Sequence, residues 1–251
     1  MDISLAAEPI LEIGHIEITN SLITSLLVTV LLLCFVFFLN KKGLKQVPRG
    51  VQNVVEIIFE GLFNLMKGVT GDEKRARRFF PLVATFFIVI ILSNYFGLLP
   101  FVGSIGFHEV HEGKELFVPL FRSANSDLNT TLALALVSVI STHVLGVTAL
   151  GFWKHTGKFV NFKLLLKSPI MFAVGILEIF GEISKVVSFS FRLFGNIFAG
   201  EVLLVVMGTL VAFVAPVPFY LLELFVGFIQ ALVFAMLTLV FLTMATEESH
   251  H

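Results

Sequence analysis

The chain has 251 residues, of which 57% are hydrophobic and 14% are charged, and its mean hydropathy is +0.95. Soluble domains are roughly half apolar and about one quarter charged, so this composition is that of an integral membrane protein. The formal net charge of −1 gives no basic excess that would point to a nucleic-acid partner, and the single cysteine, Cys34, excludes an intramolecular disulfide and a thiolate metal site.

Five apolar segments are long enough to cross a bilayer, whose core of about 30 Å needs about 20 residues of helix. They predict an all-α protein that forms a single membrane domain over residues 1–251, with spans at 18–39, 80–101, 128–152, 169–207 and 219–245. Between the first two spans, residues 48–68 carry apolar side chains at helical spacing and polar side chains on the other face. We expect an amphipathic helix in the membrane interface, acting as an anchor or a docking surface.

The lysines and arginines predict the orientation, because short cytoplasmic loops are enriched in them. Segments 40–49, 67–78 and 153–167 carry four, five and four of these residues. The loop 102–127 has two against four acids, and 208–218 has none. With an external N-terminus and a cytoplasmic C-terminus, every lysine- and arginine-rich loop lies on the cytoplasmic side.

The last two spans are longer than a direct crossing requires. At 1.5 Å per residue, residues 169–207 make a helix of about 58 Å and residues 219–245 one of about 40 Å. The first must tilt steeply or break to fit a core of about 30 Å, and the second should lean as well. Since Gly208, Pro216 and Pro218 mark a tight turn between them, we predict a strongly tilted antiparallel hairpin.

Polar residues of this hairpin are candidates for function, because ionisable groups at membrane depth are costly and persist where they face protein or water. At 100° per residue, Arg192 shares a helix face with Glu178 and Asn196, whereas Glu201 lies on the opposite face. Glu182 and Lys185 are three residues apart, and this spacing fits a structural ion pair as well as it fits a functional role.

Facing residues of an antiparallel hairpin have nearly constant index sums, and the turn at 208–218 predicts a sum of about 426. Arg192 is therefore expected level with Gln230, and Glu201 level with Glu223. Two facing acids cannot both ionise cheaply, so one of them should hold a proton near neutrality. Such a pair suits a proton relay, with a hydrogen-bonded structural pair as the alternative.

Three stretches, "SFRLFGNIFAGE", "SDLNTTLALAL" and "QALVFAMLTLVFLTMATEE", closely resemble the a subunits of bacterial F-type rotary ATP synthases, and the likeness covers the whole chain in order. The resemblance implies a proton-translocating stator subunit of the bacterial cell membrane, with two offset half-channels beside a ring of c subunits. Its implied partners are this c-ring, the b-subunit peripheral stalk, other synthase subunits and membrane lipid. It implies no catalytic site, cofactor or metal of its own.

The resemblance also implies which residues translocate protons: Arg192, Glu201, Glu223, Asn196, Gln230, Glu178, Ser184 and Ser188. Arg192 matches the essential arginine between the half-channels. Because arginine keeps its charge at any physiological pH, it cannot relay protons, but it can attract a deprotonated ring carboxylate and block leakage. Glu201 and Glu223 match the outer channel, where some relatives have histidine in place of Glu223, and Glu178 with the two serines matches the inner path.

Two other classes of membrane protein compete with this interpretation. A secondary ion-coupled transporter also has tilted or broken helices with buried charge, but it usually shows two related halves, and no inverted repeat is visible. A haem-bearing electron-transfer subunit would need paired membrane histidines, and only His143 lies well inside a span. The sequence contains no nucleotide-binding loop or catalytic triad, so we expect no enzymatic activity from the chain alone.

Overall fold

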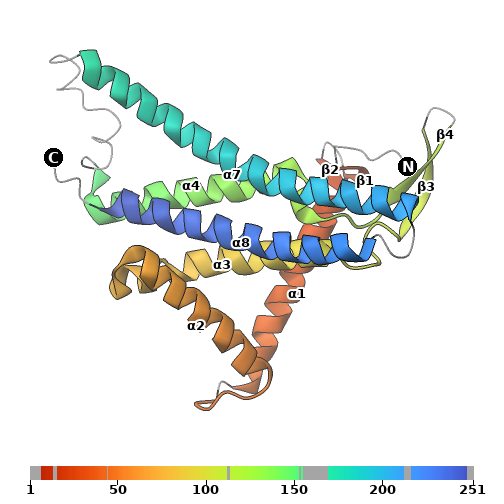
Figure 1. Cartoon of the computed structure of the whole chain (residues 1–251), viewed down its shortest axis with the longest axis horizontal. Helices are drawn as coiled ribbons and strands as arrows, with labels where there is room; N and C mark the ends of the chain where they lie inside the picture. The colour runs from red at the N-terminus through yellow and green to blue at the C-terminus, as the bar shows by residue number, and fades with distance from the viewer. Residues whose placement is uncertain are drawn as a thin grey trace.

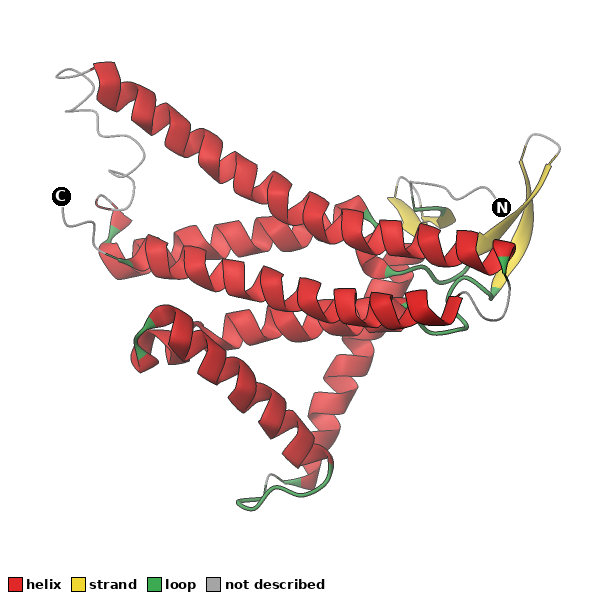
Figure 2. Cartoon of the chain, viewed as in Figure 1, coloured by secondary structure: helices red, strands yellow, loops and turns green. Residues whose placement is uncertain are grey.

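A computed structural model describes residues 7–13, 16–43, 45–111, 114–152, 154, 169–211 and 216–247. Long helices make up most of it (Figure 2). Their bounds are α1 (Asn20–Lys42), α2 (Val51–Thr70), α3 (Glu73–Gly97), α4 (Leu128–Leu150), α7 (Pro169–Leu210) and α8 (Pro216–Thr246). Within the described residues, five helices are long and apolar enough to span a membrane, and α2 is not one of them. The predicted all-α membrane fold is confirmed. Most of the predicted basic segment 153–167 lies outside the described residues.

The largest difference in helix bounds is at α3, which begins at Glu73 rather than at residue 80. Asp72 caps this helix, because its side chain accepts a hydrogen bond of 2.8 Å from the backbone N–H of Lys74. The charged residues that follow are helical although they are not apolar. A prediction based on apolar length alone therefore starts this helix too late.

Two short antiparallel hairpins were not predicted. Strand β1 (Pro9–Ile13) pairs with β2 (Ile16–Thr19), and β3 (Gly106–His111) pairs with β4 (Lys114–Pro119). Both lie at the end of the molecule where α7 ends and α8 begins (Figure 2). Apolar span length carries no signal for such ribbons, and the loop 102–127 was interpreted through its charges alone.

The five long helices do not share one direction. Helices α3, α4, α7 and α8 run side by side, whereas α1 crosses their direction (Figure 1). The bilayer normal cannot be parallel to α1 and also to the other four helices. If α1 crosses the membrane directly, the other four must therefore be tilted. Helix α7 is continuous over 42 residues, or about 63 Å, and therefore meets a core of about 30 Å by tilting rather than by breaking.

Helices α7 and α8 form the predicted antiparallel hairpin, close together beside their connection and apart where α7 begins (Figure 1). The core lies between α3, α4, α7 and α8, where the Phe189 and Phe234 ring centroids are 4.9 Å apart. Buried hydroxyls pair across the helices: Ser138 with Thr238 at 2.8 Å, and Thr131 with Ser190 at 3.4 Å. Because a membrane interior offers no water, such pairs favour one register between α4 and its neighbours.

Helix α1 buries its polar side chains in its first turns. Asn20, Ser21 and Thr24 are fully buried, whereas most of the remaining α1 side chains are exposed, as Phe37 is. The Ser21 hydroxyl donates to the Asp127 carboxylate at 2.7 Å, and Asn20 Nδ2 donates to the carbonyl of Pro119 at 3.3 Å. These bonds attach α1 to the segment that joins β4 to α4.

Helix α2 is amphipathic, as predicted. Leu62, Met66 and Thr70 are buried, and α2 packs against α3 and α8. Its exposed apolar residues include Val54 and Ile58. The location of this helix in the membrane interface stays a prediction.

Candidate functional site

Arg192 lies on the open side of α7. Its Nη2 donates to the Ser188 hydroxyl, one turn earlier, at 3.0 Å, and the adjacent Leu193 is fully buried in the core. Within the described part of the chain, Arg192 has no carboxylate at ion-pair distance. The exposed face next to it mixes apolar and hydroxyl side chains: Leu177, Phe180, Ser184, Ser188 and Phe191. A charged group on such a face is costly against lipid, which favours a protein or aqueous neighbour.

Asn196 and Gln230 connect α7 to α8. Asn196 Nδ2 donates to Gln230 Oε1 at 2.7 Å, and Gln230 is buried. Their indices add to 196 + 230 = 426, the sum that the short turn predicts. Gln230 was expected level with Arg192, but its hydrogen-bond partner lies one helical turn nearer the α7–α8 connection. Arg192 is thus next to this amide pair along the helix rather than part of it.

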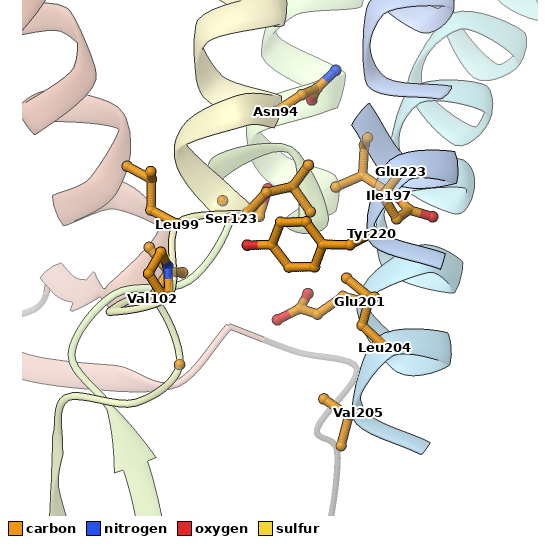
Figure 3. Close-up of a pocket in the computed structure, with 14 residues that line it drawn as sticks. Asn94, Leu99, Val102, Ser123, Ile197, Glu201, Leu204, Val205, Tyr220 and Glu223 are labelled. Atoms are coloured by element: carbon orange, nitrogen blue, oxygen red, sulfur yellow. The ribbon is translucent and has the colours of Figure 1, made fainter. Parts of the chain in front are cut away.

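A cavity of about 250 Å³ opens near the α7–α8 connection, between the end of α3, the loop after α3, Ser123, α7 and α8. Glu201 projects into it from α7 and Tyr220 from α8, and Glu223 lies at its edge between the two helices (Figure 3). The predicted outer acids therefore line one cavity. Among its other walls are apolar residues such as Ile197 and Leu204, which leave the carboxyls as its main ionisable groups.

Glu201 and Glu223 have different neighbours inside this cavity. Glu201 Oε1 lies 3.5 Å from Nε of Arg122, a residue between β4 and α4. Glu223 is 6% exposed, and its carboxyl lies against Gly200, where an added Cβ would overlap it. Contact between positions 200 and 223 agrees with the predicted register to within a turn. The two acids, which were expected to face each other as a pair, therefore line the same cavity, but each of them contacts a different neighbour.

We predict that Gly200→Ala displaces the Glu223 carboxyl and slows any ion transport that uses it by about tenfold or more, since about 1 Å of misplacement can cost up to about 100-fold. The subunit should still assemble, because the overlapped atoms end a flexible side chain. The measurement is proton pumping in membrane vesicles. Gly208→Ala is the matched control, because a Cβ there meets nothing within 4 Å. Equal pumping by the two variants would contradict the prediction.

A second polar cluster lies on the part of α7 that precedes Arg192. Lys185 Nζ is 2.6 Å from Glu182 Oε1, and His143 Nε2 on α4 is 3.4 Å from Glu182 Oε2. The Lys185 ammonium also lies 4.6 Å from the Phe241 ring centroid. The ion-pair interpretation of Glu182 and Lys185 is confirmed, and His143 has an acidic neighbour that spacing did not predict. In the described residues, no cluster of histidine, cysteine and acidic side chains could hold a metal ion.

The remaining inner-path candidates are not brought together with the outer acids. Glu178 is half-buried on α7, one turn before Glu182. Ser184 is exposed, and its hydroxyl donates to the carbonyl of Phe180 at 2.8 Å. These residues and the cavity lie along α7 on either side of Arg192.

Sequence reasoning missed a chain of buried amides beside the cavity. Asn125, in the short helix η1 (Ala124–Ser126), donates to Asn94 Oδ1 at 2.7 Å, and Asn94 Nδ2 donates to the carbonyl of Gly227 at 3.0 Å. The one signal in the sequence was an asparagine inside an apolar span. Arg122 was also missed, since it was counted only as one of two cations in an acidic loop.

Comparison with known proteins identifies the family. The family model described as ATP synthase A chain matches residues 22–243. The chain is 38% identical over 222 residues to "ATP synthase subunit a" of Campylobacter jejuni subsp. jejuni serotype O:23/36 (strain 81-176). The matched region covers 88% of this chain and 88% of the relative. It is 37% identical over 221 residues to the protein of that name in Campylobacter concisus, with 88% of this chain and 87% of the relative covered.

A relative from another genus, "ATP synthase subunit a 3" of Pelobacter propionicus, is 38% identical over 221 residues, with 87% of this chain and 84% of the relative covered. The matched region contains all eight candidate residues and at least most of each of the five long apolar helices. This multi-pass membrane protein belongs to the ATP synthase A chain family.

Proposed function

We propose that the chain is the proton-translocating stator subunit of a rotary ATP synthase, in which Arg192 separates two offset half-channels beside a ring of c subunits. Family membership supports the general role and favours it over a secondary transporter. The observation that carries the finer proposal is the position of Arg192. It lies on an open face of α7, without a carboxylate partner in the described residues, between the acid-lined cavity and the polar residues of the other half of α7.

The cavity is the proposed external half-channel. Glu201 and Glu223 line it, and carboxyls can accept and release protons without a change of fold. Glu201 is more accessible than Glu223, so we assign Glu201 to the uptake of protons from external water and Glu223 to a later transfer. The path continues towards Asn196 and Gln230, which cannot titrate but can orient water and the ring carboxyl.

The exposed face of α7 before Arg192 is the proposed internal half-channel. Ser184 and Ser188 contribute hydroxyls to this face, and Glu178 lies on α7 nearer to the start of the helix. Hydroxyls can both donate and accept hydrogen bonds, so they can support a chain of water molecules towards the cytoplasm. The Glu182–Lys185 pair nearby keeps its own charges balanced.

Arg192 acts between these paths as a fixed positive charge. It favours the deprotonated form of a passing ring carboxylate and prevents a proton from moving directly between the half-channels. The hydrogen bond to Ser188 leaves most guanidinium donors available for that carboxylate. The ion gradient drives the cycle with about 2.3 kcal/mol per charge for each 100 mV.

A photo-crosslinking experiment in the assembled complex tests the ring-facing surface. A benzophenone analogue of phenylalanine at Phe191, exposed beside Arg192, is expected to crosslink to the c subunit. The matched control is the same analogue at Phe37, an exposed phenylalanine on α1, which should not reach the ring. A crosslink to the ring from position 37 but not from position 191 would contradict the proposal.

The proposed orientation has an external N-terminus and a cytoplasmic C-terminus. In a Cys34→Ser background, Ser104→Cys should react with a membrane-impermeant maleimide from outside, and Lys74→Cys from the cytoplasm, because basic segments stay inside. Labelling of intact cells and of inverted vesicles measures this directly. Reaction of both positions from the same side would overturn the proposed orientation.

A further inference from the structure

We propose that Arg122 is a positioning residue for proton uptake at Glu201: it holds the Glu201 carboxyl in the cavity as one half of an ion pair and thereby sets the external pH range over which the subunit accepts protons. The proposal rests on the proposed function above, because it concerns the same external half-channel.

The first observation is the burial of Arg122 in a connecting segment, where most arginines reach water. Its side chain is 6% exposed, its Nε lies 3.5 Å from Glu201 Oε1, and its guanidinium carbon lies 5.8 Å from the ring centroid of Phe198. Burying a guanidinium costs several kcal/mol unless a counter-charge is close. Arg122 therefore interacts with two residues of α7 that lie on the cavity side of Arg192.

The second observation is that Arg122 is held from behind by α1. Its backbone N–H donates to the Thr24 hydroxyl at 3.3 Å, and Thr24 is fully buried. The same first turns of α1 bind Pro119 and Asp127 on either side of Arg122. The backbone at Arg122 is thus attached to α1, so α1 helps to fix the position from which the Arg122 side chain reaches Glu201.

The third observation is that the ion pair is loose. Glu201 is 32% exposed, Arg122 approaches its Oε1 at 3.5 Å, and its Oε2 is buried without a hydrogen-bond partner in the described residues. A bidentate pair at shorter distance would hold the carboxylate too firmly for proton uptake. This geometry orients the carboxyl, while the Glu201 side chain as a whole stays partly exposed to the cavity.

The transfer balances without any further reactant. A proton from external water binds a Glu201 oxygen and neutralises the carboxylate, while Arg122 keeps its charge. The proton then moves to the next carboxyl, and Glu201 returns to the ionised partner of Arg122. The other titratable groups that face this cavity in the described residues are Glu223 and Tyr220 of α8, and α3 contributes the uncharged Asn94.

The test is ATP synthesis by the reconstituted complex, with lumenal (external-side) and outer (cytoplasmic-side) pH varied separately at a membrane potential set by potassium and valinomycin. Arg122→Gln should move the lumenal pH of half-maximal synthesis measurably upward, because proton uptake no longer takes place next to a fixed positive charge. The dependence on cytoplasmic-side pH should stay unchanged. Arg122→Lys should retain most of the wild-type profile. Arg77→Gln is the matched control, because Arg77 is exposed and distant in sequence from the cavity segments.

A purely structural role predicts a different result, in which Arg122→Gln lowers the rate equally at every lumenal pH. That result, or an unchanged lumenal profile, overturns the proposal. If Arg122→Gln does not assemble, Thr24→Val provides the second measurement, because it releases the Arg122 backbone and should shift the lumenal profile in the same direction by a smaller amount. An unchanged profile in Thr24→Val would then count against the proposal. Failure of the proposed function is separable, since it would appear as normal pumping by variants of Arg192.

Discussion

Arg192→Ala is expected to reduce ATP-driven proton pumping to about one hundredth of wild type or less, a loss typical for removal of a principal electrostatic group. The subunit should still assemble, because the Arg192 side chain lies on an open face of α7 and its one described hydrogen bond is to the exposed Ser188. Passive proton leak should rise, since the barrier between the half-channels is lost. Quenching of a pH-sensitive dye in vesicles that contain the verified complex measures both effects.

Arg192→Lys should also fail to couple pumping to ATP hydrolysis. A lysine ammonium is a compact charge that cannot bind a carboxylate through a planar fork, and it loses its proton more readily when desolvated. Arg77→Lys is the control, because Arg77 is an exposed arginine outside the proposed path. Normal ATP-driven pumping by either Arg192 variant in a fully assembled complex would refute the proposed role of Arg192.

Glu201→Gln is the second large effect, with pumping expected to fall by about 100-fold because glutamine cannot carry a proton between water and the next carboxyl. Part of the loss should come from removal of the negative charge that lies 3.5 Å from the buried Arg122 guanidinium. Proton pumping in vesicles is compared with the amount of assembled complex to separate these causes. Full pumping by Glu201→Gln would remove Glu201 from the path.

Glu223→His is the matched comparison in the same cavity. Imidazole titrates near neutrality, and Gly200 leaves space beside position 223, so this variant should retain a large part of wild-type pumping. A loss as severe as that of Glu201→Gln would show that a carboxyl is required at position 223. The two substitutions together distinguish a relay that needs a titratable group from one that needs these particular acids.

Local patterns in the sequence were enough for the spans and for the hairpin. A membrane helix needs a continuous apolar length, so α1, α4, α7 and α8 could be placed within a few residues of their observed bounds. The short connection between α7 and α8 restricts their register, and Asn196 pairs with Gln230 at the index sum that the turn predicts. The length of α7 alone required tilt or a break, because a helix rises by a constant amount per residue.

By itself, then, the sequence determined the membrane class, the five spans, the amphipathic α2 and the candidate residues of the α7–α8 hairpin. Only the tertiary structure decided that α1 crosses the other helices, that Gly200 leaves room for Glu223, and that His143 lies near Glu182. It also brought Arg122 to Glu201. The physical reason is that spacing reports the face of one element, whereas contacts between distant segments depend on how several elements pack. Arg122 lies in an irregular segment held by α1, so no helical or strand period could predict its neighbour on α7.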